Sequence, residues 1–81
     1  MMNAHATVAL DVSSLQAPEP MERILDALES LAPGAALQVL IHREPYLLYE
    51  ILDRRGWRHR TTRRRDARYD LLIERQPCNA P

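Results

Sequence analysis

Residues 17–24, Ala-Pro-Glu-Pro-Met-Glu-Arg-Ile, decide how this chain folds, because they define where its first helix begins. Pro20 suits the first turn of a helix, since the amide that proline lacks would have no partner there. Glu19 and Glu22 suit the same end, where the helix dipole is positive. We expect a helix from about Pro20 to Leu31, with one buried stripe at three- and four-residue spacing: Met21, Ile24, Leu25, Leu28 and Leu31.

Short strands are expected on both sides of this helix. Residues 6–11 place Val8 and Leu10 on one face, at the period of two that a strand requires. A loop then leads to the helix, and residues 33–34, Pro-Gly, end it. Residues 35–42 are almost entirely apolar in the middle, which is typical of a central strand.

A second helix and a hairpin are expected in the remaining half. Pro45 opens a helix that runs to about Arg55, and Gly56 ends it, because helices often end in left-handed backbone. Residues 57–63 and 67–74 should pair as a hairpin with its turn near residues 64–66. The inward positions of the second helix are Leu48, Ile51 and Leu52.

The resulting order, β-α-β-α-β-β, predicts an α+β fold. Two helices and four short strands form a two-layer sandwich, with both helices on one face of a mixed sheet and the other face open. We expect a single domain over residues 6–75, a disordered N-terminus over residues 1–5 and a flexible tail over residues 76–81.

Composition limits the possible function. With 81 residues and one cysteine, Cys78, the chain cannot form an internal disulfide. Two glycines are too few for a glycine-rich phosphate loop. No stretch reads as a signal peptide or a membrane span, so we expect a cytoplasmic protein with no membrane partner. We also expect no enzymatic activity and no cofactor.

The motifs of this chain resemble those of a known superfamily. Residues 10–12, Leu-Asp-Val, lead to residues 18–24, Pro-Glu-Pro-Met-Glu-Arg-Ile, and residues 55–57, Arg-Gly-Trp, follow the second helix. This pattern is similar to sulfur-carrier domains of the TusA/SirA-like fold, in which a Cys-Pro-x-Pro motif begins the first helix. The resemblance covers about residues 6–75. It is nearest to a bacterial family of unknown function that carries Pro-Glu-Pro-Met and lacks the cysteine.

The departures from the carrier pattern change what the resemblance implies. Carriers bind a persulfide on the motif cysteine, whose thiolate the helix N-terminus favours. Ala17 stands at that position here, and alanine cannot carry sulfur. Ser13 stands where the cysteine-free family often has arginine. The resemblance therefore implies the carrier scaffold without the carrier chemistry.

Our leading interpretation is a binding or adaptor module whose partner is another protein. The family-specific residues fall in residues 11–21 and 42–49, which we expect to share one face of the fold. The alternative for the Pro-Glu-Pro motif is a purely structural role as a rigid helix start. The candidate binding residues are Asp11, Pro18, Glu19, Pro20, His42, Tyr46 and Tyr49.

Charge is distributed unevenly along a chain whose formal net charge is zero. Residues 11–53 hold eight acids against two arginines, and residues 54–68 hold eight arginines against one acid. A basic hairpin could bind an anion, a protein or RNA, although the missing aromatic platform argues against nucleic acid. The simpler alternative is a solvated hairpin in which Arg58 or Arg60 pairs with Asp70. The candidate basic patch comprises Arg54, Arg55, Arg58, Arg60, Arg63, Arg64 and Arg65.

Three further alternatives stay open. Cys78 could relay sulfur from the tail, or it could be an incidental exposed thiol. His42, with Asp11, Glu44, Tyr46 or Tyr49, could hold a metal or haem in redox metabolism, or it could simply bond to the backbone. An exposed sheet face or edge strand also permits weak homo-oligomers.

Overall fold

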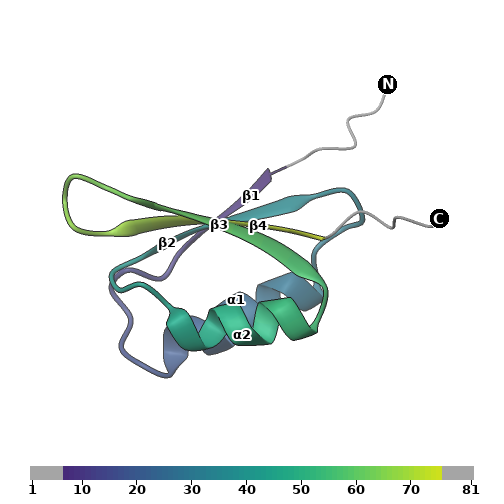
Figure 1. Ribbon diagram of the computed structural model, residues 1–81, viewed down its shortest axis with the longest axis horizontal. Helices are drawn as coiled ribbons and strands as arrows, with labels where there is room; N and C mark the ends of the chain where they lie inside the picture. Colours follow the sequence, from purple (N-terminus) through teal and green to yellow (C-terminus); the bar gives the residue numbers. More distant parts are fainter. Residues whose placement is uncertain (1–6, 76–81) are drawn as a thin grey trace.

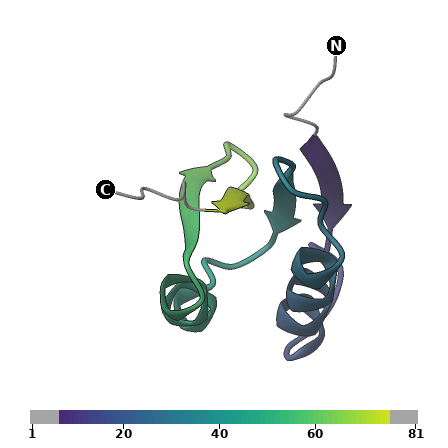
Figure 2. The same cartoon turned by 90° about the vertical axis from the view of Figure 1, so that its right-hand side faces the viewer.

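The computed structural model describes residues 7–75, which form six elements in the expected order (Figure 1). The elements are β1 (Thr7–Asp11), α1 (Glu19–Glu29), β2 (Ala36–Ile41), α2 (Tyr46–Arg54), β3 (Trp57–Arg63) and β4 (Tyr69–Arg75). Both helices cover one face of the sheet (Figures 1 and 2). The expected α+β two-layer sandwich is therefore confirmed.

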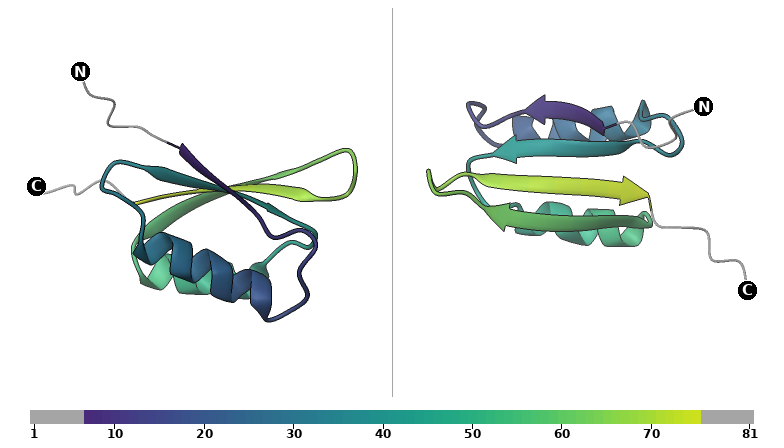
Figure 3. Two further views of the ribbon diagram at one scale, coloured as in Figure 1. Left: turned by 180° about the vertical axis from the view of Figure 1, so that it is seen from behind. Right: turned by 90° about the horizontal axis from the view of Figure 1, so that it is seen from above.

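The sheet has the strand order β1-β2-β4-β3. β1 runs parallel to β2, whereas β4 is antiparallel to both of its neighbours. Seen from above, α1 lies beneath β1 and β2, and α2 lies beneath β3 (Figure 3). The register aligns Thr7 with Ala36 and Ala36 with Glu74. The described chain therefore enters and leaves the sheet at the same end of the strands.

The core lies between the sheet and the helices. Alternate residues of each strand face the helices, as the pleat requires, and the central strands completely bury Leu37, Val39, Leu71 and Ile73 on this face. The buried apolar residues are Val12, Ile24, Leu28, Leu37, Val39, Ile41, Leu48, Leu52, Trp57, Leu71 and Ile73. The opposite face has no helix over it within residues 7–75, and there Leu72 is half-buried between Gln38 and Arg60, its neighbours in the register.

Helix boundaries differ slightly from the expected ones. α1 begins one residue early, at Glu19, and ends at Glu29, because the amides of Ser30 and Leu31 bond to Ala27 and Leu28 in a tighter final turn. Leu31 still packs against the core. α2 is one residue shorter at each end than expected, and Gly56 follows it with φ +82°, as predicted for a helix end.

The expected ion pair between Arg58 or Arg60 and Asp70 is wrong. Arg58 instead bonds to Glu74, with 3.1 Å between guanidinium nitrogen and carboxylate oxygen. The register explains the difference, because it sets Arg58 directly opposite Glu74 and Arg60 opposite Leu72. Asp70 is paired with Arg64 at 3.2 Å.

No helix among residues 7–75 is long and apolar enough to cross a membrane.

Candidate binding groove

A groove of about 750 Å³ opens between the two helices where both of them begin. Its position follows from the topology. β1 and β2 are parallel and each leads into a helix, so both helices start near the carboxyl ends of these strands, at the same end of the sheet. The groove is lined by residues 16–18, 20, 21, 24 and 41–48. The opposite end of the sheet holds the row of Thr7, Ala36 and Glu74.

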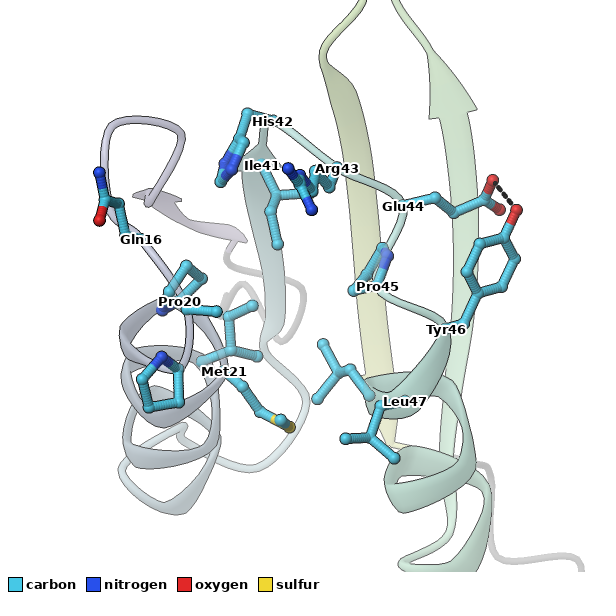
Figure 4. A pocket seen from close by; sticks show the side chains of 14 residues that line it. Gln16, Pro20, Met21, Ile41, His42, Arg43, Glu44, Pro45, Tyr46 and Leu47 are labelled. Atoms are coloured by element: carbon cyan, nitrogen blue, oxygen red, sulfur yellow. Dashed lines mark hydrogen bonds between the residues drawn. The ribbon is translucent and has the colours of Figure 1, made fainter.

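The groove is apolar at its base and along its walls. Pro20, Ile24, Ile41 and Leu48 are buried residues that also line it. Figure 4 shows Met21 of α1 and Leu47 of α2 pointing toward one another across the gap. Leu47, which lies beside the hydrophobic core, is 60% exposed. The two helices therefore leave an apolar surface between them that neither one covers.

The Pro-Glu-Pro motif forms one side of the groove. The Ala17–Pro18 peptide bond is cis, Pro18 is the N-cap residue, and Pro20 turns its ring into the groove wall. Glu19 lies in the first turn, but its carboxylate bonds to Arg23 one turn further along, at 3.5 Å. Glu19 is exposed and is not part of the groove lining.

Polar side chains stand at the mouth of the groove. His42 and Arg43 follow β2 directly, and His42 points toward the loop that carries Gln16 (Figure 4). Arg43 forms no ion pair with any residue between 7 and 75. Within the same described region, no three His, Cys, Asp or Glu side chains are placed to hold a metal ion. The mouth thus offers one positive charge that the described fold does not neutralise.

Glu44 lies on the α2 side of the groove, and its carboxylate is hydrogen-bonded to two tyrosines. Its carboxylate oxygens accept hydrogen bonds from Tyr46, at 2.9 Å, and from Tyr49, at 3.1 Å. The hydrogen bond to Glu44 raises the pKa of Tyr46. Burial is the main cause that raises the pKa of Tyr49. The Glu44 and Tyr46 side chains turn away from the gap between the helices (Figure 4).

Tyr49 belongs to a polar network on the outer flank of α2. Its hydroxyl also bonds to the hydroxyl of Thr61 on β3. Its ring stacks on that of His59, with centroids 4.6 Å apart and an interplanar angle of 2°. His59 in turn lies 3.0 Å from a carboxylate oxygen of Asp53. This network joins α2 to β3 and contributes nothing to the groove lining.

Asp11 lies in a separate charged cluster at the end of β1. Its carboxylate accepts two hydrogen bonds from Ser13, which lower its pKa. Arg68, before β4, donates to the Ser13 hydroxyl at 3.4 Å and to Asp66 at 2.6 Å. Bonding to Arg68 lowers the pKa of Asp66 to about 2. The cluster ties the hairpin to the loop after β1, outside the groove.

The structure thus brings four of the seven candidate binding residues to the groove: Pro18, Pro20, His42 and Tyr46. Asp11, Glu19 and Tyr49 lie outside its lining. Arg43, Leu47 and Met21 lie within the two segments expected from sequence, residues 11–21 and 42–49, but none of them was named as a binding residue, and Met21 was expected in the buried stripe of its helix. Leu47 carried a signal, because it is a large apolar residue outside the expected inward positions of its helix.

The arginines of the candidate basic patch lie close together in sequence but not in space. Arg54 and Arg55 lie at the end of α2, whereas Arg58 and Arg60 lie on the open face of the sheet. Residues 63–65 lie at the far end of the hairpin, where Arg64 pairs with Asp66 and Asp70. Arg75 stacks over Trp57, with its guanidinium carbon 4.4 Å from the ring centroid. The arginines therefore do not converge on one anion site.

Cys78 and the remainder of the expected tail lie outside the described residues. Arg75, the last described residue, pairs with Trp57 at the end of the sheet remote from Ala17.

Comparisons with known proteins identify a family and a fold. A family model described as "Uncharacterized conserved protein (DUF2249)" matches residues 9–75. A solved structure of a SirA-like protein from Desulfitobacterium hafniense superposes with a TM-score of 0.76 at 16% identity, over 86% of this chain and 99% of that one. At that identity the likeness shows the fold alone. No curated protein sequence matches the chain.

Proposed function

We propose a non-catalytic binding function for this chain, which belongs to the DUF2249 family of uncharacterised conserved proteins. In this proposal the groove between α1 and α2 takes an apolar side chain from a segment of a partner protein. The observation that carries it is an apolar cavity of about 750 Å³ with an exposed leucine on its wall.

The exposed apolar surface favours a protein partner over a small molecule. Tyr46 and Leu47 are 68% and 60% exposed, and they are two of the three large apolar residues that are strongly exposed among residues 7–75. A small ligand inside the groove would leave the outer surface of both side chains in water. A protein segment that crosses the groove and continues over the start of α2 would cover both, as the core of a protein interface does.

The charge at the mouth of the groove indicates what the segment carries. Arg43 has no acidic partner among residues 7–75, whereas both oxygens of Glu44 are occupied by tyrosine hydroxyls. An acidic residue beside the apolar side chain would pair with Arg43. We therefore expect partner segments that combine one large apolar residue with a neighbouring Asp or Glu.

Selection from a random peptide library displayed on phage, with the full chain immobilised, tests this proposal. Selected peptides should share an apolar residue next to an acid, and fluorescence anisotropy then measures their affinity. Leu47→Glu should weaken binding about 10- to 100-fold, which corresponds to losing roughly 1.5–3 kcal/mol of apolar contact. Arg43→Gln should weaken it by up to about fivefold, as expected of an exposed ion pair.

The matched control is Arg54→Gln, which removes an exposed arginine at the far end of α2 and should leave the affinity unchanged. Peptides that bind Leu47→Glu as tightly as the unaltered chain would overturn the proposal. Octanoate is the probe for a small apolar carboxylate. If octanoate shifts the amide resonances of residues 41–44 and 46–48 and no peptide is selected, the groove binds small molecules instead.

The alternative functions have less support. The arginine-rich hairpin disperses its charge, and three of its members are engaged in ion pairs: Arg58, Arg64 and Arg68.

A further inference from the structure

The two edge strands of the sheet differ in how they are protected against pairing. Within residues 7–75 no strand pairs with the outer side of β1 or with that of β3. Such an edge presents backbone N–H and C=O groups that another strand can bond, and proteins commonly block it with charges, proline or a bulge. β1, Thr-Val-Ala-Leu-Asp, has no proline, no basic residue and a single charge at its end.

β3 is blocked by its arginines. Arg58, Arg60 and Arg63 lie within its seven residues. If two copies paired antiparallel through the centre of β3, Arg60 would lie opposite Arg60 of the second copy, and like charges directly opposite are destabilising. Of the two edges, β1 alone lacks this protection.

We propose that two copies of this chain associate through β1, antiparallel, with Ala9 on the two-fold axis. This register sets Val8 opposite Leu10 of the second copy and Thr7 opposite Asp11 of the second copy. Each contact then occurs twice, as a two-fold interface requires. No like charges meet, and the two sheets join into one continuous sheet.

The exposure of Val8 supports this register. Val8 pairs with Leu37 in the register and so lies on the helix-covered face, yet it remains 47% exposed. Leu10 lies on the same face and is half-buried. In the proposed dimer, Leu10 of the second copy covers the exposed side of Val8, so that apolar surface left open in one copy is buried in two.

The charge of α1 does not oppose the contact. Its acids, Glu19, Glu22, Asp26 and Glu29, lie on the opposite side of the helix from buried Ile24 and therefore point away from the sheet. Met21 marks the flank that lines the groove. The other flank, on the side of β1, carries the small residues Ala27 and Ser30 together with Arg23, whose guanidinium is paired with the Glu19 carboxylate. Two α1 helices can therefore approach one another across the axis.

Disulfide trapping tests the register. In a Cys78→Ser background, Ala9→Cys places two thiols directly opposite one another, within disulfide reach. Mild oxidation should give a covalent species of about twice 9.4 kDa on a non-reducing gel. The matched control is Thr7→Cys, whose two thiols would lie roughly 13 Å apart along the paired strands and should not link. Equal cross-linking of both variants, or of neither, would overturn the proposal.

Sedimentation velocity tests the association without a cross-link. The unaltered chain should shift from monomer to dimer as its concentration rises, and Val8→Arg should weaken the dimer at least tenfold. Leu47→Arg introduces the same charge at the other exposed apolar site and should leave the dimer intact. A chain that stays monomeric up to about 1 mM, or a dimer that Val8→Arg does not weaken, would contradict the proposal. Because Val8 lies away from the groove, failure here leaves the groove proposal untouched.

Discussion

The two helices lie on the same sheet but are attached to it by different kinds of contact. α1 buries Pro20, Ile24 and Leu28, and none of its side chains hydrogen-bonds to the sheet within residues 7–75. α2 buries Leu48 and Leu52 and is also linked to β3 by polar side chains on its outer flank. Apolar contacts are non-directional, whereas hydrogen bonds fix orientation. We therefore expect α2 to be the fixed wall of the groove and α1 to be the wall that adjusts.

The largest expected effect comes from removing one buried side chain from each helix. Ile24 and Leu52 are both 0% exposed, so Ile24→Ala and Leu52→Ala should each lower the free energy of unfolding by about 2–5 kcal/mol. Urea titration measures this loss. Amide hydrogen exchange then separates the helices: beyond the increase that lower global stability gives to every element, Ile24→Ala should speed exchange most in α1, whereas Leu52→Ala should speed it most in α2 and β3. Equal exchange in both helices of both variants would contradict the comparison.

A smaller effect is expected from the tyrosine that links α2 to the sheet. Tyr49→Phe removes the hydroxyl that bonds to both Thr61 and Glu44, so the free energy of unfolding should fall by about 1 kcal/mol. Tyr46→Phe is the matched control, because Tyr46 bonds only to Glu44 and is 68% exposed. It should change stability by less than about 0.5 kcal/mol. If the two variants lose the same stability, the contact with β3 does not hold α2 in place.

The smallest effect concerns the charged cluster that joins the hairpin to the loop after β1. The folded-state pKa of Asp66 is about 2, below its ordinary value of 3.8. The stabilisation from ionised Asp66 is therefore fully present above pH 3.8 and is lost as the pH falls toward 2. Asp66→Asn should flatten the fall of the urea midpoint between pH 4 and pH 2. An unchanged slope would show that the cluster does not contribute to stability.

Two sequence signals made the layers and faces of this fold predictable: the alternation of apolar and polar residues in the strands, and the proline and glycine residues at the helix ends. The period of two in residues 57–63 correctly placed Trp57 and His59 on one face of the sheet and Arg58 and Arg60 on the other. The cross-strand partner of Arg58 was not predictable from that period, because any shift of the hairpin by two residues preserves the same faces. The turn geometry sets the register, and it places Glu74 rather than Asp70 opposite Arg58.

The candidate site was only partly predictable for a similar reason. Motif positions located the two segments that border the groove, and Pro18 and His42 lie on it. The groove itself depends on the lateral distance between α1 and α2, which no periodicity within one helix encodes. Met21 and Leu47 face one another only because the helices leave that gap. Tyr49 was a candidate because it lies close to the other site residues in sequence, but its position on α2 directs its hydroxyl to Thr61 of β3.

The alignment of Thr7, Ala36 and Glu74 in one row has a practical consequence for tethering. Both ends of the described domain leave from the side opposite the groove, so a linker attached to either end points away from the binding surface. A chain anchored to a larger assembly, or to a sensor surface, by either end would present the groove outward. Immobilisation from the Thr7 end or from the Arg75 end of the described domain should therefore give the same apparent affinity for a peptide in the groove.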